Sequence, residues 1–184
     1  MRILYLWRKD EPVIRNTIYD YSHSFERYDK NNEYFYFNIW NGRYKEDYSW
    51  IQPGMFDAII FDYSAVSLRN SVKHWNNFLE LMKILKDYDC IKVIFVQDDY
   101  TKTGGVWSLA NEINADVIFT VLRDVDIDKL YGKHIKSSIK VKNVLTGYVE
   151  DGYLSKYTFQ SHHERNWDVV YRARKLPYEF GKHG

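Results

Sequence analysis

The chain contains little cysteine and almost no net charge. Its single cysteine, Cys90, cannot form an internal disulfide, and 26 Lys plus Arg balance 25 Asp plus Glu to give a formal net charge of +1. Such a balance provides no general attraction to nucleic acid or to an anionic membrane, so no nucleic-acid partner is predicted. The first apolar run, ILYLW, ends before Arg8 and Lys9 and is too short for a signal peptide. No stretch approaches the roughly 18 apolar residues of a membrane span. These absences predict a soluble, cytoplasmic protein.

The residues that are present suit one folded domain. The chain has 184 residues, of which 45% are hydrophobic and 28% charged, enough for a single sizeable core. Aromatic residues make up 18%, with 17 Tyr and 6 Trp. Tyr and Trp can stack on sugar rings or bases, but core packing is the expected role for most of them.

Apolar runs alternate with helical patterns along the first two thirds of the chain. Several of the runs are apolar on both faces, which is typical of parallel strands covered by helices. Strands are predicted at residues 3–7, 33–40, 55–63, 91–97 and 116–122. Helices are predicted at residues 13–28, 68–85, 106–113 and 127–131, the last stopped by Gly132. This order predicts an α/β fold with a three-layer, Rossmann-like open sheet that is mainly parallel.

The last third of the sequence has a weaker pattern. WDVVYRAR, residues 167–174, is predicted as a sixth strand, and Pro177 opens a helical pattern just before the chain stops. A domain seldom ends where a helix begins. We therefore expect residues 1–184 to be one Rossmann-like domain of a longer, two-domain protein, with residues 171–184 leading into the interdomain region.

Polar side chains follow several of the predicted strands directly. In doubly wound sheets, ligands bind beyond the carboxyl ends of the strands, where the strand order reverses. Two interpretations are open: a binding rim, or residues that cap helices and carry each strand out of the core. Neighbouring residues face different ways, so at most one of the two adjacent aspartates is expected to point into a cleft. The predicted rim comprises Arg8, Lys9, Asp62, Tyr63, Asp98, Asp99 and Tyr100.

A glycine pair follows this rim at Gly104 and Gly105. A strand–loop–helix transition there could present backbone N–H groups to an anion. The competing interpretation is a turn that needs positive φ ahead of a capped helix. The spacing matches neither of the phosphate-binding glycine motifs, and no glycine follows the first strand, so no dinucleotide fingerprint is predicted.

Three further groups of polar residues point to no cofactor. Adjacent His162 and His163 lack other metal ligands around them, and the acidic residues 124–128 lack the glycine and glutamate of a calcium loop. The two histidines are expected to be solvated, and the acidic residues are expected to begin a helix. A basic group is expected to form a solvated face, with attraction to phosphate or an anionic lipid surface as the alternative. The basic group comprises Lys133, Lys136, Lys140 and Lys142.

The chain resembles the N-terminal domain of bacterial glycosyltransferases of the GT-B type. The resemblance rests on ILYLW, FDAIIFDYS, IKVIFVQDDY, DVIFTVL and VLTGYVED in this order, and on a YRAR segment that leads to PYEFG near the end. It implies two Rossmann-like domains facing a cleft, of which this one binds the acceptor and the absent one binds the nucleotide sugar. The missing glycine-rich loop after the first strand departs from that pattern.

The resemblance also implies roles for individual residues. Asp98 or Asp99 would act as general base on an acceptor hydroxyl, a role that requires a carboxylate. The remaining rim residues, Gly104 and Gly105, and Arg172 and Arg174 of the basic segment would bind substrate. The acceptor would be a glycan or a lipid-linked sugar, with a possible peripheral membrane contact. The implied activity is sugar transfer from a nucleotide-sugar donor, with no cofactor and no metal, and the isolated domain is expected to be inactive.

Two other classes of function stay open. The first is a flavodoxin-like or receiver-like binding module that holds a divalent cation in an acidic pocket, although Arg123 stands where such a module has a lysine. The second is a structural or interaction protein. If Asp98 and Asp99 face solvent, replacing either with Asn should change stability by no more than about 1 kcal/mol.

Overall fold

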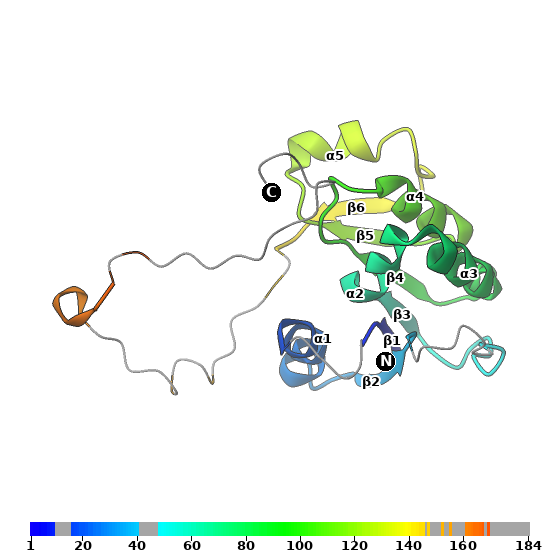
Figure 1. Cartoon of the computed structure of the whole chain (residues 1–184). Coiled ribbons are helices and arrows are strands. Elements are labelled where there is room, and N and C mark those ends of the chain that lie inside the picture. Colours follow the sequence, from blue (N-terminus) through cyan, green and yellow to red (C-terminus); the bar gives the residue numbers. More distant parts are fainter. Residues whose placement is uncertain are drawn as a thin grey trace. The chain divides into compact units, whose positions relative to one another are not determined.

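The computed structural model describes residues 1–9, 16–40 and 48–145, and also residues 147, 152, 155, 161–167 and 169. The chain divides into two units, Met1–Tyr148 and Val149–Gly184. The first unit contains a complete α/β sheet (Figure 1). In the second unit, the described residues include a short 3-10 helix, η3, at His162–Glu164. None of the described helices is long and apolar enough to cross a membrane.

The first unit is built on a six-stranded sheet in which every pair of neighbouring strands is parallel. The strand order is β2-β1-β3-β4-β5-β6. The order reverses beside β1, as in doubly wound folds. The strands span Arg2–Trp7 (β1), Glu33–Asn38 (β2), Ala58–Phe61 (β3), Ile91–Phe95 (β4), Val117–Thr120 (β5) and Lys140–Asn143 (β6).

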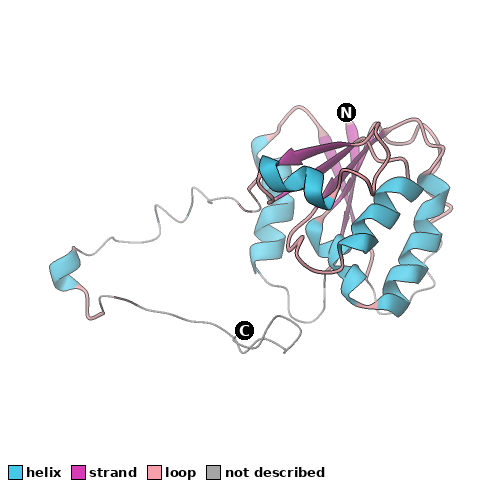
Figure 2. Cartoon of the chain, turned by 90° about the horizontal axis from the view of Figure 1, so that it is seen from above, coloured by secondary structure: helices cyan, strands magenta, loops and turns pink. Residues whose placement is uncertain are grey.

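Helices cover both faces of this sheet, which makes three layers (Figure 2). They are α1 (Asn16–Tyr28), α2 (Tyr63–Val66), α3 (Val72–Met82), α4 (Thr103–Glu112) and α5 (Asp124–Leu130). The predicted α/β class and the mainly parallel, three-layer sheet are confirmed. So are the five strands expected from the apolar runs, each within a few residues of its predicted bounds.

The strands bury alternate side chains in two separate cores. On one face, Tyr5, Ile60 and Phe95 pack against Tyr21 and Phe25 of α1. This core is mostly aromatic, with ring centroids 5.4 Å apart for Tyr5 and Phe25 and also for Phe25 and Phe95. Several of the described tyrosines thus serve core packing, as expected.

The opposite face carries the larger and more aliphatic core. Leu4, Leu6, Ile59 and Ile94 of the strands are almost completely buried there. They pack against a group of side chains from α3, α4 and the end of α5. That group includes Trp75, Phe78, Met82, Val106, Leu109, Ala110 and Tyr131.

Three predictions of secondary structure need correction or fall outside the described residues. The helix predicted at 68–85 is interrupted at Ser71, where φ is −119°, and divides into η1 (Ser67–Asn70), α3 and η2 (Lys83–Leu85). The sixth strand is Lys140–Asn143, where no strand was predicted. The basic residues Lys133, Lys136, Lys140 and Lys142 are nevertheless all exposed, as expected of a solvated face. The predicted strand at 167–174 lies mostly outside the described residues.

Candidate functional site

The carboxyl ends of β1 and β3 lie side by side where the strand order reverses. These strands are direct neighbours, with Leu6 opposite Phe61 in the register. The residues that leave the two strands are Arg8 and Lys9 on one side and Asp62 and Tyr63 on the other. The sheet therefore brings together these four predicted rim residues. This position is where ligands bind in doubly wound sheets.

Asp62 is completely buried and fully bonded. One carboxylate oxygen accepts hydrogen bonds from the backbone N–H and the hydroxyl of Ser64, and the other accepts from the Tyr5 hydroxyl at 2.7 Å. The Ser64 bonds cap the start of α2. Burial raises the pKa of Asp62, and these hydrogen bonds oppose the shift. Asp62 is thus a helix cap, which was the second interpretation of the predicted rim residues. Its buried carboxylate cannot reach a ligand.

Arg8 and Lys9 lie at the rim and are partly exposed. The guanidinium of Arg8 lies 4.6 Å from the centre of the Trp40 ring, a cation–π contact, and its backbone N–H donates to Ser64 Oγ at 3.0 Å. The backbone N–H of Lys9 donates to Asn38 Oδ1 at 2.9 Å. Both contacts fix the backbone beyond β1 while the charged groups stay at the surface.

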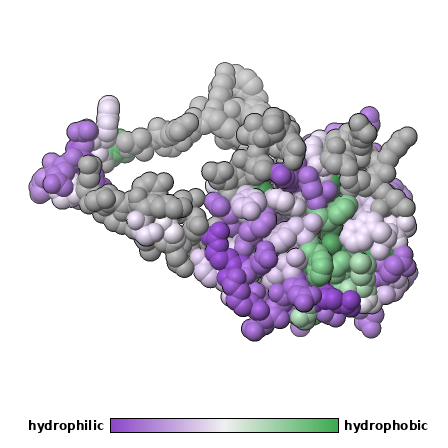
Figure 3. Space-filling view, turned by 90° about the horizontal axis from the view of Figure 1, so that it is seen from below, coloured by the Kyte–Doolittle hydropathy of each residue, from purple (hydrophilic) through white to green (hydrophobic). Residues whose placement is uncertain are grey.

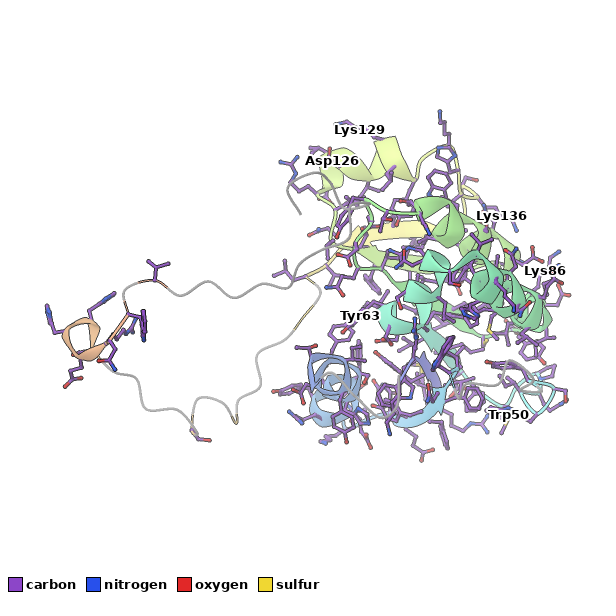
Figure 4. All side chains as sticks on the ribbon, in the orientation of Figure 1. Trp50, Tyr63, Lys86, Asp126, Lys129 and Lys136 are labelled. Atoms are coloured by element: carbon purple, nitrogen blue, oxygen red, sulfur yellow. The ribbon has the colours of Figure 1, made fainter. Side chains whose placement is uncertain are left out.

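Tyr63 lies at the carboxyl edge of the sheet, on the β3 side of the switch point (Figure 4). Its ring packs edge to face on Tyr21 of α1, with centroids 5.1 Å apart. Part of the Tyr63 side chain therefore packs against the aromatic core.

The loop between β4 and α4 is held by a buried arginine. Arg69, at the end of η1, is only 4% exposed. Its guanidinium donates to four backbone carbonyls, those of Val66, Gln97, Asp98 and Thr101, at 3.1, 2.8, 3.1 and 3.3 Å. Three of these carbonyls belong to the loop, so one side chain fixes its path. Because Arg69 follows α2, it also connects this loop to the switch point.

The clamped loop has an unusual backbone. Asp98 has φ of 61° and Lys102 has φ of 48°, both in the left-handed region. Non-glycine residues adopt this region at a cost, and they persist there only where the surroundings impose the conformation. Such positions concentrate at functional sites, so this loop is the strongest candidate for one in the described residues.

Asp99 points into the protein. It is 1% exposed, and its two carboxylate oxygens accept from Thr120 Oγ1 at 2.6 Å and from the hydroxyl of Tyr131. Burial, followed by the charge of Asp99 and this hydrogen bond, raises the pKa of Tyr131. Burial lowers the pKa of Arg69, and the charge of Asp99 opposes that shift. The expectation that Asp99 faces solvent is therefore wrong. A carboxylate with both oxygens bonded in the core cannot take a proton from an acceptor.

Asp98 and Tyr100 point outward on the same loop. Asp98 is exposed, and the side chain of Tyr100 is 74% exposed. Partial desolvation, then the charge of Asp98 and a hydrogen bond to it, raises the pKa of Tyr100. Of the two adjacent aspartates, only Asp98 faces outward, and its expected place in a cleft stays a prediction.

The glycine pair serves packing rather than a turn. Gly104 and Gly105 lie inside the first turn of α4, and the positive φ ahead of the helix belongs to Lys102. A Cβ on Gly105 would lie 2.9 Å from Arg69 Cβ and 3.0 Å from Trp75 Nε1. A Cβ on Gly104 would approach nothing closer than 3.8 Å. Gly105 thus allows α4 to lie close to the clamping arginine.

The remaining candidate residues show no second site. No group of three or more metal-ligating side chains occurs within the part of the chain that the structure describes. His162 and His163 are exposed, and Asp124 and Asp126 occupy the first turn of α5, both as expected. Cys90 is partly buried, and burial raises its pKa, so it is a poor nucleophile. Arg172 and Arg174 lie outside the described residues.

Sequence reasoning missed the three side chains that organise the loop. Arg69, Thr120 and Tyr131 come from three different elements, and each is distant in sequence from Asp99. No local pattern in the sequence distinguished these three residues.

These features define the class of the protein as a doubly wound α/β domain with a preorganised loop at the carboxyl edge of its sheet. Comparison with known protein families, curated proteins and solved structures finds no match. The resemblance to glycosyltransferases of the GT-B type therefore stays a prediction.

Proposed function

We propose that this α/β unit is the acceptor-binding domain of a GT-B type glycosyltransferase. Its acceptor would lie across the carboxyl edge of the sheet, between the switch point at Arg8 and the loop that carries Asp98. The acceptor is a glycan or a lipid-linked sugar, which would bring the domain close to a membrane surface. The nucleotide-sugar donor would bind to a second domain.

One observation supports this proposal above the others. The β4–α4 loop is held in a strained conformation by Arg69, and it presents an exposed carboxylate, Asp98, beside an exposed aromatic ring, Tyr100. A general base must reach the hydroxyl that it deprotonates, and an aromatic face suits stacking on a sugar ring. Asp98 would be the base and Tyr100 the sugar platform. Asp99 is assigned the structural role that its burial requires.

The binding part of the proposal can be tested on the 184-residue chain itself. Saturation-transfer NMR against a panel of soluble oligosaccharides should detect binding that Tyr100→Ala abolishes. Tyr28→Ala is the matched control, since Tyr28 is 54% exposed at the far end of α1. No sugar transfer from nucleotide sugars is expected from this chain alone. Transfer by the purified chain, or oligosaccharide binding that survives Tyr100→Ala, would contradict the proposal.

The catalytic part requires an enzyme that includes a donor-binding domain. There, Asp98→Asn should lower turnover about a hundredfold or more while leaving the melting temperature unchanged. Asp87→Asn is the control because Asp87 is an exposed acid just before β4, at the amino edge of the sheet. Full turnover in Asp98→Asn would remove Asp98 from the mechanism.

A further inference from the structure

The edge strand β2 lacks the features that usually keep sheet edges apart. Among the described residues it pairs on one side only, with β1, through six consecutive register positions from Glu33 to Asn38 and no bulge. Its sequence, EYFYFN, contains no proline and no positive charge, and its one acid stands at the first position. Natural edge strands are commonly protected by lysine, proline, a bulge or a short length. This strand has none of these protections.

Aromatic side chains line both faces of β2. Tyr34 and Tyr36 lie on the α1 face, and Phe35 and Phe37 on the opposite face. Phe35 and Phe37 continue into a group of apolar residues beside the strand, in which Phe35 is 45% exposed, and Trp50 and Met55 are each 39% exposed. The rings of Phe35 and Phe56 are 5.6 Å apart, and those of Phe37 and Trp50 are 5.4 Å apart.

This apolar surface is continuous on the β2 side of the molecule. Figure 3, which views the unit from that side, shows one patch of hydrophobic side chains between polar regions. Trp50 lies on the side of β2 away from α1 (Figure 4), where its ring contacts that of Phe37. We define the β2 edge surface as Tyr34, Phe35, Tyr36, Phe37, Trp50 and Met55.

We propose that β2 pairs antiparallel with β2 of a second copy of this chain, forming a dimer with a continuous sheet. The proposal is independent of the proposed function. A two-fold axis perpendicular to the sheet keeps the two faces aligned, so only residues on the same face can lie opposite one another. Of the registers that meet this condition, two pair the most aromatic residues. The first places Phe35 opposite itself and Tyr34 opposite Tyr36. The second places Phe35 opposite Phe37 and Tyr36 opposite itself.

Both registers match aromatic residues across the interface and avoid pairs of like charge. Aromatic cross-strand pairs each add roughly 0.2–1 kcal/mol relative to alanine pairs, whereas like charges directly opposite would destabilise. The only charged residue of the strand, Glu33, approaches the far end of the second copy's strand. That end of the strand carries no charge, so Glu33 meets no like charge there.

The exposed area predicts a weak dimer. Taking about 200 Å² for a large side chain, the exposed fractions of Phe35, Trp50 and Met55 leave roughly 250 Å² of apolar surface per copy. A standard interface buries about 800 Å² per partner, so backbone pairing along the strand must supply much of the affinity. We expect a concentration-dependent monomer–dimer equilibrium rather than a permanent dimer.

Sedimentation equilibrium of the full 184-residue chain over a wide concentration range tests this proposal. The wild type should form dimers as concentration rises, and Phe35→Lys should weaken the dimer at least about tenfold because it places a charge in the edge. Asn143→Lys is the matched control, since it adds the same charge to the exposed edge strand β6 at the other end of the sheet. Circular dichroism of each variant verifies folding, and the 45% exposure of Phe35 predicts little loss of stability.

A cross-linking experiment makes the test independent of affinity. Opposite residues of antiparallel strands have Cα atoms about 4.5–5.5 Å apart, within the range of a disulfide. In a Cys90→Ala background, mild oxidation should therefore cross-link Phe35→Cys into dimers in the first register, or Tyr36→Cys in the second, and leave Asn143→Cys monomeric in either case. A wild type that stays monomeric at all concentrations would overturn the proposal. So would a dimer that Asn143→Lys disrupts and Phe35→Lys does not.

Discussion

The guanidinium of Arg69 donates a hydrogen bond of 3.1 Å to the backbone carbonyl of Asp98, a residue whose own φ is 61°. The buried Arg69 side chain thus stabilises a left-handed backbone conformation of the exposed Asp98, which is unfavourable for a non-glycine residue. Arg69 lies in η1 and Asp98 follows β4, so the contact also connects two successive crossover segments of the sheet. The rigidity of the candidate site therefore originates outside the loop that forms it.

Arg69→Met should destabilise the protein by about 3 kcal/mol or more. The substitution leaves four backbone carbonyls, one buried and three partly buried, without their donor and Asp99 without a nearby positive charge. Urea denaturation followed by circular dichroism measures the change. The control is Arg123→Met, because Arg123 forms only an exposed pair with Asp126 and should change stability by no more than about 1 kcal/mol. Equal effects of the two substitutions would show that Arg69 does not clamp the loop.

Asp99→Asn and Asp98→Asn should differ strongly in stability, although the residues are adjacent. Asp99→Asn replaces an oxygen that accepts from a buried hydroxyl with an NH₂ group, and we expect a loss of about 2 kcal/mol. Asp98→Asn should stay within about 0.5 kcal/mol, because Asn also tolerates the left-handed region and Asp98 is exposed. Thermal melts of the two variants provide the comparison. If Asp99→Asn were as stable as the wild type, Asp99 would face solvent, as the sequence suggested.

Gly104→Ala and Gly105→Ala should have opposite signs. Gly104 has open space in the first turn of α4, so alanine should stabilise the protein by about 0.5 kcal/mol through lower chain entropy. At Gly105 the new methyl would meet Arg69 Cβ and Trp75 Nε1, and the expected loss is about 1–3 kcal/mol. Denaturant midpoints of the two variants measure both effects. Each variant is the other's control, and two changes of the same sign would contradict the packing role of Gly105.

The fold was largely predictable from the sequence because its signals are local. The apolar runs at β1, β3 and β4 are buried on both faces, and such runs identify parallel strands directly. The strand β6 was missed because three of the four residues of KVKN are exposed and two are lysines, so its pairing with β5 decides its structure. Ser71 interrupted a helix that periodicity predicted as continuous.

The candidate site was predictable in position but not in detail. The carboxyl edge follows from topology, and the sheet brings the predicted rim residues to it as two groups, one at the switch point and one after β4. Which of Asp98 and Asp99 faces outward depends on Thr120 and Tyr131, whose contacts with Asp99 span 21 and 32 residues of sequence. No local pattern encodes such contacts. No local pattern encodes the burial of Asp62 either, because its carboxylate is bonded by the hydroxyl of Tyr5 in β1.

Asp62→Asn should change how stability depends on pH. The pKa of Asp62 in the folded protein is raised above its ordinary value of 3.8, chiefly by burial, so the folded state holds its proton more tightly than the unfolded state. The resulting stabilisation is fully present below pH 3.8 and is lost as pH rises through the folded pKa. Asparagine cannot ionise, so the stability of Asp62→Asn relative to wild type should improve as pH rises from roughly 4 to 7.

Asp126→Asn supplies a control of opposite sign. Hydrogen bonds and charge from Lys129 and Arg123 lower the pKa of Asp126, so its contribution is present above the ordinary pKa and lost as pH falls through the folded pKa. Relative to wild type, Asp126→Asn should therefore become less stable as pH rises from roughly 2 to 4, by a small amount because the pair is exposed. Urea unfolding of the wild type and both variants at several pH values between roughly 2 and 7 gives the three curves. The difference in free energy of unfolding between Asp62→Asn and wild type should therefore not be constant across this range. A constant difference would mean that the carboxyl of Asp62 has the same pKa in the folded and unfolded states. Its burial in the folded protein would then be in error.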